Sequence, residues 1–302
     1  MTLDQLRIFV EVAERQHLTQ AASVLALTPS AVSSAIKALE ERYGTPLFHR
    51  VGRRIETSPA GRIFLDEARR TLASARAAEA TLAELGALQR GSLVIHASQT
   101  ISSYWLPPLL VRFRQAHPAI ALELVIANTD HVAQAVLQGT ADLGFIEAAT
   151  DEPALAMTAV SRDRLIAVVG NHHPWADGRP LARADVLAAQ WVQRQPGAGT
   201  RAAFEAALAA LGIAADALPV ALVLPSNEAV RSAVMAGPYA AAMSELVVAQ
   251  HLQAGLLAQA NLVLPARQFF MLRHPARHQS RAAAAFERLM QDAEATRYQY
   301  QA

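Results

Sequence analysis

Two neighbouring segments between residues 18 and 40 carry apolar residues at the spacing of an α-helix, and this pattern constrains the fold more than any other in the chain. Each segment gathers its apolar residues on one helical face: Ala21, Ala22 and Leu25 in the first, and Val32, Ile36 and Leu39 in the second. Between the segments, Thr28 can cap the second helix and Pro29 suits its first turn. The pattern therefore predicts two helices that pack across a tight turn, a helix-turn-helix unit.

The second of these helices is predicted to turn a small, polar face away from its apolar one. That face carries short hydroxyl side chains and a single cation: Ser30, Ser33, Ser34 and Lys37. A helix with such a face is what a helix-turn-helix unit places in the major groove of DNA. Arginines that can reach phosphates follow shortly after. We therefore predict that double-stranded DNA is contacted by nine residues: Thr19, Thr28, Ser30, Ser33, Ser34, Lys37, Arg50, Arg53 and Arg54.

Three further stretches accompany the two helices, at residues 3–13, 47–50 and 57–61. Together with them, the first 62 residues resemble the LysR-type family of bacterial transcriptional regulators, and the resemblance extends in order and length over the whole chain. It implies a winged helix-turn-helix domain at residues 1–60. The chain departs from the family at two positions. Many members carry Gln where this chain has Pro29, and Gln or Arg where it has Ser34. Fewer long side chains are therefore left to read base edges.

Composition limits the class of protein and its environment. The formal net charge is +1, so DNA affinity is expected to rest on the local arginines and on dimerisation rather than on overall charge. The absence of cysteine excludes disulfides, thiol redox sensing and cysteine metal sites. No apolar run reaches the roughly 18 residues of a membrane span, and the acidic N-terminal segment does not resemble a secretory signal. These features predict a cytoplasmic protein without a membrane partner.

A long helix is predicted after the wing, at residues 58–89. Its first residues belong to the DNA-binding domain, and residues 61–89 form the linker helix between the two domains. Apolar residues recur along it at spacings of three and four: Leu65, Ala68, Leu72, Ala75, Ala78, Leu82 and Leu85. This seam belongs either to a buried helix of a single globular domain or to an antiparallel dimerisation helix. Its place after a DNA-binding unit favours dimerisation, because paired half-sites need two copies at a fixed separation. A homodimer or homotetramer is therefore expected.

Strand and helix patterns alternate from residue 90 onward. The predicted strands are 93–97, 121–126, 143–146, 165–169, 191–193, 220–224, 262–264 and 269–272, and the predicted helices are 104–116, 130–137, 200–211, 228–235 and 281–294. Such alternation predicts parallel sheets with right-handed crossovers. The strands are too many for one small sheet, so residues 90–302 are expected to form a periplasmic-binding-protein-like effector domain with two α/β lobes. With crossings near Ser161 and Pro265, lobe I comprises residues 90–160 and 265–302, and lobe II residues 161–264.

Polar residues gather where predicted strands end and helices begin. They are Ser98, Gln99, Thr100, Asn128, Thr129, Thr200, Arg201, Ser226 and Asn227. In open α/β sheets, ligands bind outside the carboxyl ends of the strands. Helix N-termini there offer free N–H groups and partial positive charge, so the clusters together predict an effector site for an anion. Plain helix capping, or a site for a sugar or an amino acid, would use the same residue types.

The stretches 97–101, 128–129 and 144–147 resemble the LysR-type subgroup that regulates sulfur assimilation and carbon fixation. This resemblance adds Glu147 to the effector site and implies a small molecule such as sulfite, sulfate or a phosphorylated metabolite. A single cleft arginine, Arg201 with Arg194 as the alternative, favours the smaller anion, because a sugar bisphosphate usually calls for several cations. Trp105 is either a core residue or part of the cleft wall.

No pattern in the sequence indicates catalysis or a metal. There is no G-x-S-x-G, P-loop or dinucleotide fingerprint, so neither catalytic residues nor a cofactor are predicted. The adjacent His172 and His173 have no third ligand nearby in the sequence, so no metal site is predicted there. The favoured function is a transcriptional regulator that is modulated by a small effector, with RNA polymerase as a further partner. A solute-binding transport protein and a DNA-binding protein indifferent to ligands are the alternatives.

Overall fold

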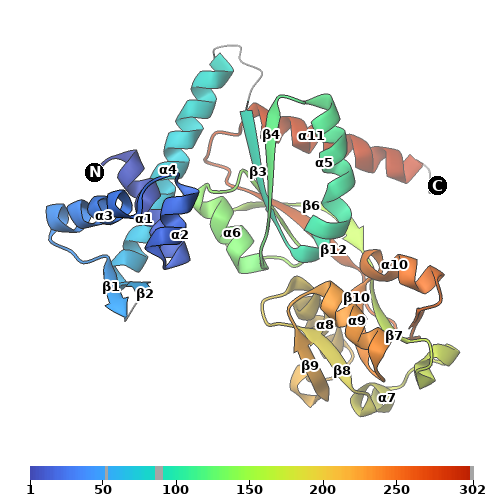
Figure 1. Cartoon of the computed structure of the whole chain (residues 1–302). Coiled ribbons are helices and arrows are strands. Elements are labelled where there is room, and N and C mark those ends of the chain that lie inside the picture. The colour runs from blue at the N-terminus through green and yellow to red at the C-terminus, as the bar shows by residue number, and fades with distance from the viewer. Residues whose placement is uncertain (52–53, 86–90, 300–302) are drawn as a thin grey trace. The chain divides into compact units, whose positions relative to one another are not determined.

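The computed structural model describes residues 1–51, 54–85 and 91–299, which form two units (Figure 1). The first unit contains helices α1 to α4 and strands β1 and β2, and the second contains the elements from β3 to α11. Among the described residues, no single helix is long and apolar enough to cross a membrane, and one bent pair, α2 with α3, meets the length and composition criteria only when taken together.

The N-terminal unit is built on the predicted helix pair. Its helices are α1 (Leu3–Arg15), α2 (Leu18–Val24) and α3 (Pro29–Tyr43), and its wing pairs β1 (Phe48–Val51) with β2 (Arg54–Thr57) in antiparallel register. The Thr28 hydroxyl caps α3 by accepting the backbone N–H of Ala31 at 3.2 Å, and Gly44 ends the helix with a φ of 63°. The apolar faces of α2 and α3 meet α1 in one core, so the predicted winged helix-turn-helix is confirmed.

Helix α4 (Pro59–Leu85) follows the wing and uses its apolar residues in two ways. Ala68 is buried in the N-terminal core, and Leu65 and Leu72 pack against that core. Farther along the helix, the Leu82 side chain is 70% exposed. The prediction of one continuous seam is therefore wrong for its first part, because α1 packs along α4 there and covers these residues within the same chain.

The first sheet of the second unit has the strand order β4–β3–β5–β12–β6. Its strands are β3 (Gly91–Ala97), β4 (Ile120–Ile126), β5 (Leu143–Ile146), β6 (Ala156–Asp163) and β12 (Arg267–Arg273). β3 pairs in parallel with β4 and β5, as predicted, but β12 runs antiparallel to β5 and β6. The prediction of an all-parallel sheet is wrong here, because β12 returns directly from the other lobe instead of through a helical crossover.

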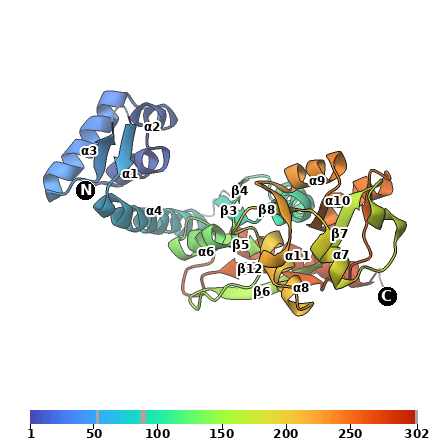
Figure 2. The ribbon, with the colours of Figure 1, turned by 90° about the horizontal axis from the view of Figure 1, so that it is seen from below.

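Helices cover both faces of this lobe I sheet (Figure 2). They are the π-helical turn η1 (Ile101–Trp105), α5 (Leu106–Ala116), α6 (Thr129–Gln138) and α11 (Arg281–Gln299). Phe145 of β5 faces a core formed with α5 and α11, whereas its neighbour Ile146 faces a separate core formed with α6. Successive residues of a strand point to opposite faces, so β5 is buried on both sides and reads as a short, continuous apolar run.

The lobe II sheet has the strand order β11–β7–β10–β8–β9. Its strands are β7 (Leu165–Gly170), β8 (Trp191–Arg194), β9 (Val220–Leu224), β10 (Ala240–Ser244) and β11 (Leu257–Gln259). Its helices are η2 (Pro174–Asp177), α7 (Arg183–Ala188), α8 (Gly199–Ala210), η3 (Ala215–Ala217), α9 (Asn227–Ala236) and α10 (Glu245–Gln253). β8 is parallel to β9 and β10, but β7 is antiparallel to β10 and β11, so this sheet is also mixed.

Residues 262–264 form no strand, contrary to the prediction. Their side chains do alternate, because Val263 is 82% exposed while its two neighbours pack against the lobe II core. However, β11 already pairs with β7 at this edge of the sheet, and Asn261 makes only an isolated bridge to Pro180. The exposure of these residues therefore alternates as in a β-strand, but no neighbouring strand among the described residues pairs with them.

The chain passes between the two sheets twice. β6 ends at Asp163 and β7 begins at Leu165, and β12 begins at Arg267 on the return. Asp163 and Arg267 are register partners in the β6–β12 pair, so the two crossings lie side by side. Residues 161–163, assigned to lobe II from the sequence, instead extend β6 in the lobe I sheet because β12 pairs with them to the end of the strand.

Candidate functional site

The outer face of α3 is the candidate DNA-binding surface. Ser30, Ser34 and Lys37 are exposed on it, and the Lys37 ammonium lies 3.5 Å from the Glu41 carboxylate. Both side chains of this pair are mostly exposed, so the pair leaves the lysine free to contact a phosphate. Ser33 is half-buried and lies at the margin of the face, which corrects its predicted outward position, because it is adjacent to the buried Val32 on the helix.

The remaining predicted DNA contacts lie around this face. Thr19 is exposed at the start of α2. The Thr28 hydroxyl serves as the α3 cap and lies 3.0 Å from the Ser30 hydroxyl. Arg53 lies outside the described residues, as do the side chains of Arg50 and Arg54. The described part of the surface therefore offers hydroxyl donors and acceptors with one lysine, which suits phosphate contacts and short-range contacts to bases.

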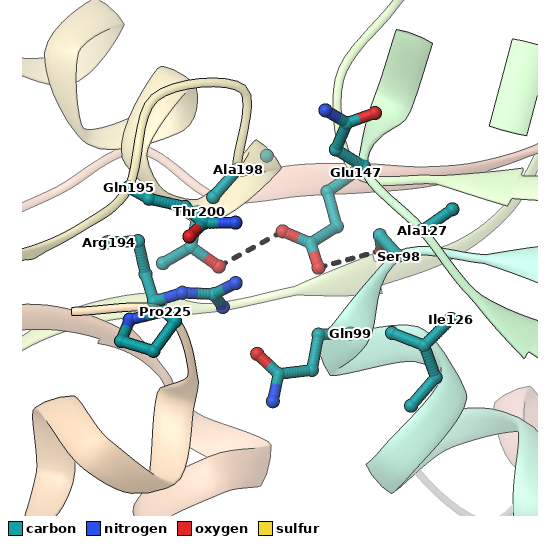
Figure 3. Close-up of a pocket in the computed structure, with 12 residues that line it drawn as sticks. Ser98, Gln99, Ile126, Ala127, Glu147, Arg194, Gln195, Ala198, Thr200 and Pro225 are labelled. Carbon is teal, nitrogen blue, oxygen red and sulfur yellow. Dashed lines mark hydrogen bonds between the residues drawn. The ribbon is translucent and has the colours of Figure 1, made fainter. Parts of the chain in front are cut away.

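A cavity of about 220 Å³ lies between the two lobes, at the carboxyl ends of strands from both sheets. Its walls come from the segments after β3, β4 and β5 in lobe I and after β8 and β9 in lobe II, together with the first turn of α8. The lining residues are Ser98, Gln99, Ile126, Ala127, Asn128, Glu147, Arg194, Gln195, Ala198, Gly199, Thr200 and Pro225 (Figure 3). This is the place where open α/β sheets bind ligands.

The Glu147 carboxylate occupies the inner wall of the cavity. It accepts hydrogen bonds from the hydroxyls of Ser98 at 2.8 Å and Thr200 at 3.0 Å (Figure 3) and from the Arg267 guanidinium at 2.7 Å. Burial raises the pKa of Glu147, but Arg267 and the hydroxyls of Thr100, Ser98 and Thr200 outweigh it, so the pKa lies below its ordinary value. Glu147 is therefore a buried anion at neutral pH.

Arg267 joins this wall to the crossings between the lobes. Its guanidinium lies 2.7 Å from Glu147 and 2.7 Å from Asp163, and all three side chains are at most 7% exposed. Asp163 also accepts the hydroxyl of Ser244, from lobe II, at 2.7 Å. Burial raises the pKa of Asp163 even though Arg267 opposes this effect. Sequence reasoning missed this network, because Asp163 and Arg267 are more than a hundred residues apart and neither belongs to a polar cluster.

Hydrogen bonds connect the two lobes around the cavity. The hydroxyl oxygens of Thr100 and Thr200 lie 3.4 Å apart, and the Asn227 side-chain amide donates to Thr100 at 3.1 Å. Glu228, in the first turn of α9, accepts from the Gln99 amide at 2.8 Å and from the Tyr104 hydroxyl at 2.9 Å. The predicted convergence of these clusters is therefore present. Glu228 itself was missed, although it directly follows the predicted pair Ser226 and Asn227.

Arg194 is the arginine that lines the cavity. Its guanidinium donates to Asn227 at 2.7 Å, and its Nε has no hydrogen-bond partner among the described residues. Burial lowers its pKa, but an arginine stays protonated at neutral pH. Arg201, favoured from the sequence, instead donates to Glu205 at 2.7 Å along its own helix and is absent from the cavity lining. The prediction is corrected because α8 directs position 201 away from the cavity.

Several predicted effector contacts lie beside the cavity and do not line it. Thr100 and Asn227 are buried in the contact between the lobes. The Ser226 hydroxyl caps α9 by accepting the backbone N–H of Ala229 at 3.1 Å, and Thr129 belongs to the first turn of α6. For Ser226 the plain capping interpretation is thus sufficient. The lining residues that prediction did not include are mainly short or apolar, and nothing in the sequence distinguishes them from ordinary loop residues.

Two residues considered from the sequence have structural roles. Trp105 packs against Phe145 and Phe269, with ring centroids 5.8 Å and 5.9 Å apart, so it is a lobe I core residue rather than part of the cleft wall. His173 accepts the backbone N–H of Trp175 at 3.1 Å at the start of η2. Within the described part of the chain, no group of three acidic or histidine side chains is arranged to hold a metal ion.

Two family models match the chain over these same regions. The model described as "Bacterial regulatory helix-turn-helix protein, lysR family" matches residues 3–62. The model described as "LysR substrate binding domain" matches residues 86–295, which is more than half of the chain. The chain belongs to the lysR family.

Relatives of this LysR-type regulator are similar over nearly their whole length. The uncharacterized HTH-type transcriptional regulator YeiE of Escherichia coli K12 is 34% identical over 95% of this chain and 96% of its own. A probable RuBisCO transcriptional regulator of Cyanidioschyzon merolae is 33% identical over 94% and 96%. CysL of Bacillus subtilis is 31% identical over 83% of each chain. The predicted resemblance to the sulfur and carbon-fixation subgroup is confirmed.

Solved structures show the same fold. Full-length CbnR complexed with its target DNA superposes with a TM-score of 0.71 at 22% identity, covering 97% of this chain and 99% of that one. The LysR-type regulator is thus a transcription regulator with a DNA-binding unit and an effector-binding domain, not an enzyme. The interpretation as a transport-type binding protein is wrong, because such a protein would lack the N-terminal unit.

Proposed function

We propose that this LysR-type regulator binds promoter DNA as a dimer or tetramer and that a small oxyanion in the cavity between its lobes modulates it. Sulfite, sulfate or a small phosphorylated metabolite belongs to this class of effector. The observation that carries the proposal is a small cavity with walls from both lobes and a single cation, Arg194. The proposal places the protein in the cytoplasm, with RNA polymerase as a partner at the promoter.

The donors around the cavity support an anion. Arg194 supplies a positive charge at the cavity wall. The first turn of α8, which includes the lining residues Gly199 and Thr200, presents backbone N–H groups that have no acceptor within the helix. The side-chain amides of Asn128 and Gln195 add further donors. At about 220 Å³ the cavity is below the roughly 300–1,000 Å³ of drug-sized ligand sites, which favours a small effector.

Regulation requires that the effector prefer one arrangement of the lobes. A ligand touching Asn128 in lobe I and Arg194 in lobe II makes both contacts only when the lobes are closed. The hydrogen bonds of Glu228 to Gln99 and Tyr104 already favour closure, so the effector adds to an existing preference. A coupling of about 1–3 kcal/mol between effector and DNA is enough to change promoter occupancy.

Arg194→Gln tests the effector site. We expect affinity for the bound oxyanion to fall roughly ten- to hundred-fold, because a charge-assisted hydrogen bond contributes about 1.5–3 kcal/mol. Isothermal titration calorimetry measures the loss. Arg183→Gln is the matched control, since Arg183 is exposed at the start of α7 and does not line the cavity, and it should leave affinity unchanged. Equal losses in both variants would contradict the assignment of Arg194.

Lys37→Ala tests the DNA-binding face. We expect binding to weaken on all DNA sequences and the slope of log affinity against log salt to fall by about one per subunit, as the loss of one phosphate contact requires. Fluorescence anisotropy at several salt concentrations measures the slope. Arg112→Ala removes the same charge from an exposed position in the effector domain and should leave the slope unchanged. An unchanged slope in Lys37→Ala would remove this lysine from the interface.

A further inference from the structure

The cavity proposed for an anionic effector has a carboxylate in its own wall. Figure 3 shows the Glu147 carboxylate directed into the space that the Arg194 guanidinium and the Gln99 amide also approach. A fully charged oxyanion in that space would meet a fixed negative charge in a site of low dielectric, where repulsion is strong. The chemistry of the wall therefore limits which oxyanions can enter.

The negative charge of the wall is only partly compensated. Arg267 is shared between Glu147 and Asp163, so one guanidinium serves two buried carboxylates. Arg194 is the cation of the cavity lining, and its guanidinium donates to the Asn227 side chain; among the described residues no hydrogen bond joins it to a carboxylate. Glu147 therefore keeps negative character toward the cavity, while Arg194 attracts an anion from the opposite side.

Glu147 is also held in place. Its oxygens accept from Ser98, Thr200 and Arg267, and a Cβ added at Gly199 would lie only 2.9 Å from the Glu147 side chain. The carboxylate therefore cannot rotate away from the cavity without breaking several hydrogen bonds. An ionised carboxylate is an acceptor only, with room for about four hydrogen bonds. It can accept a hydrogen bond from a protonated oxygen of a ligand, but it cannot donate one to an unprotonated oxygen.

We propose that Glu147 determines effector specificity: it admits an oxyanion that presents a proton or a hydroxyl group to the carboxylate and rejects one that has neither. This inference rests on the proposed oxyanion effector and narrows its class. Hydrogen phosphate, hydrogen sulfite and hydroxylated phosphate esters carry such a group at neutral pH, and sulfate does not. Rejection by a fixed repulsive group is a general route to specificity between ligands of similar size and shape.

The wild-type protein provides the first test. The full-length chain is titrated in a calorimeter at neutral pH with sodium phosphate, sodium sulfite and sodium sulfate. We expect at least one of the two proton-bearing anions to bind roughly tenfold or more tightly than sulfate, since apposed like charges cost more than the 1.4 kcal/mol that corresponds to tenfold. If sulfate binds as tightly as phosphate and sulfite, the proposed role of Glu147 is wrong, although the oxyanion effector itself is not contradicted. If none of the three binds, the proposed oxyanion effector fails as well.

Glu147→Gln provides the second test, because glutamine keeps the shape, removes the charge and adds a donor. We expect sulfate affinity to rise and its disadvantage against the better proton-bearing anion to shrink by about tenfold or more. Arg194→Gln is the comparison: it should weaken all three anions and leave their ratio unchanged. The ratio is measured within one protein, so a general loss of stability does not imitate the effect. If Glu147→Gln leaves the ratio of sulfate affinity to that of the better proton-bearing anion unchanged, the proposal is wrong. If the variant does not fold, the comparison of the three anions on the wild-type protein decides.

Discussion

Leu82→Asp is expected to yield a folded monomer whose affinity for operator DNA is lower by about 10²–10⁴-fold. The Leu82 side chain is 70% exposed in the single chain, so the aspartate remains solvated there and the fold tolerates it. In the proposed dimer the same position is covered by the partner helix, where an unpaired carboxylate is strongly disfavoured. The second DNA-binding unit then no longer binds intramolecularly at the neighbouring half-site, which removes the gain from bivalency.

Light scattering gives the mass of this variant, and fluorescence anisotropy with a two-half-site DNA gives its affinity. Leu82→Met is the matched control, because it keeps an apolar side chain and should preserve both mass and affinity. Leu72→Asp does not discriminate, since Leu72 packs against the N-terminal core of its own chain and the substitution would unfold that unit. A Leu82→Asp protein with the wild-type mass would show that this part of α4 is not the interface.

Arg267→Gln is expected to lower the stability of the effector domain by about 3–5 kcal/mol, the usual result of removing one partner from a buried ion pair. Glu147 and Asp163 would remain buried with one amide in place of the guanidinium that they share. For a domain of this size the loss corresponds to a Tm lower by roughly 6–20 °C. Thermal unfolding followed by circular dichroism measures it.

The loss of stability in Arg267→Gln should depend on pH. In the wild type the pKa of Glu147 lies below its ordinary value, so its contribution to stability is present above the unfolded-state pKa and disappears as pH falls through the folded-state pKa. The contribution of Asp163 to stability depends on pH in the opposite direction. Its raised pKa means that the protonated form favours folding, so its contribution is present at low pH and is lost as the pH rises. Without Arg267, burial raises the pKa of both carboxyl groups, and protonation as pH falls removes the uncompensated charge.

The difference in Tm between wild type and Arg267→Gln should therefore be largest near neutral pH and shrink as the pH is lowered. Arg162→Gln is the matched control, since Arg162 is exposed on β6 beside Asp163 and its loss leaves no buried charge. It should unfold within a few degrees of the wild type at every pH. A pH-independent difference for Arg267→Gln would indicate that packing, and not charge, accounts for its effect.

Local patterns in the sequence were sufficient wherever a segment's own chemistry determines its structure. The helix-turn-helix unit follows from two apolar faces and from the Thr28 cap, all of which lie within some twenty residues. Strands β3, β5 and β8 form where the sequence predicted strands, and helices α8 and α9 begin at the predicted polar clusters. The clusters that follow β3 and β4 and the one that opens α8 meet at one cavity, because the carboxyl ends of parallel strands share an edge of the sheet, and the cluster that opens α9 lies beside it.

Tertiary structure alone decided the electrostatics and the pairing. Glu147 was expected to contact the effector, but its ion pair with Arg267, which Asp163 shares, depends on two crossings that lie side by side in the fold and far apart in the chain. Residues 262–264 alternate like a strand yet lack a partner, and Leu72 repeats like a dimer seam yet packs within its own chain. Periodicity reports which face of a segment is apolar. Which other segment covers that face, and which cation neutralises a buried carboxylate, depends on contacts between distant residues that no local pattern contains.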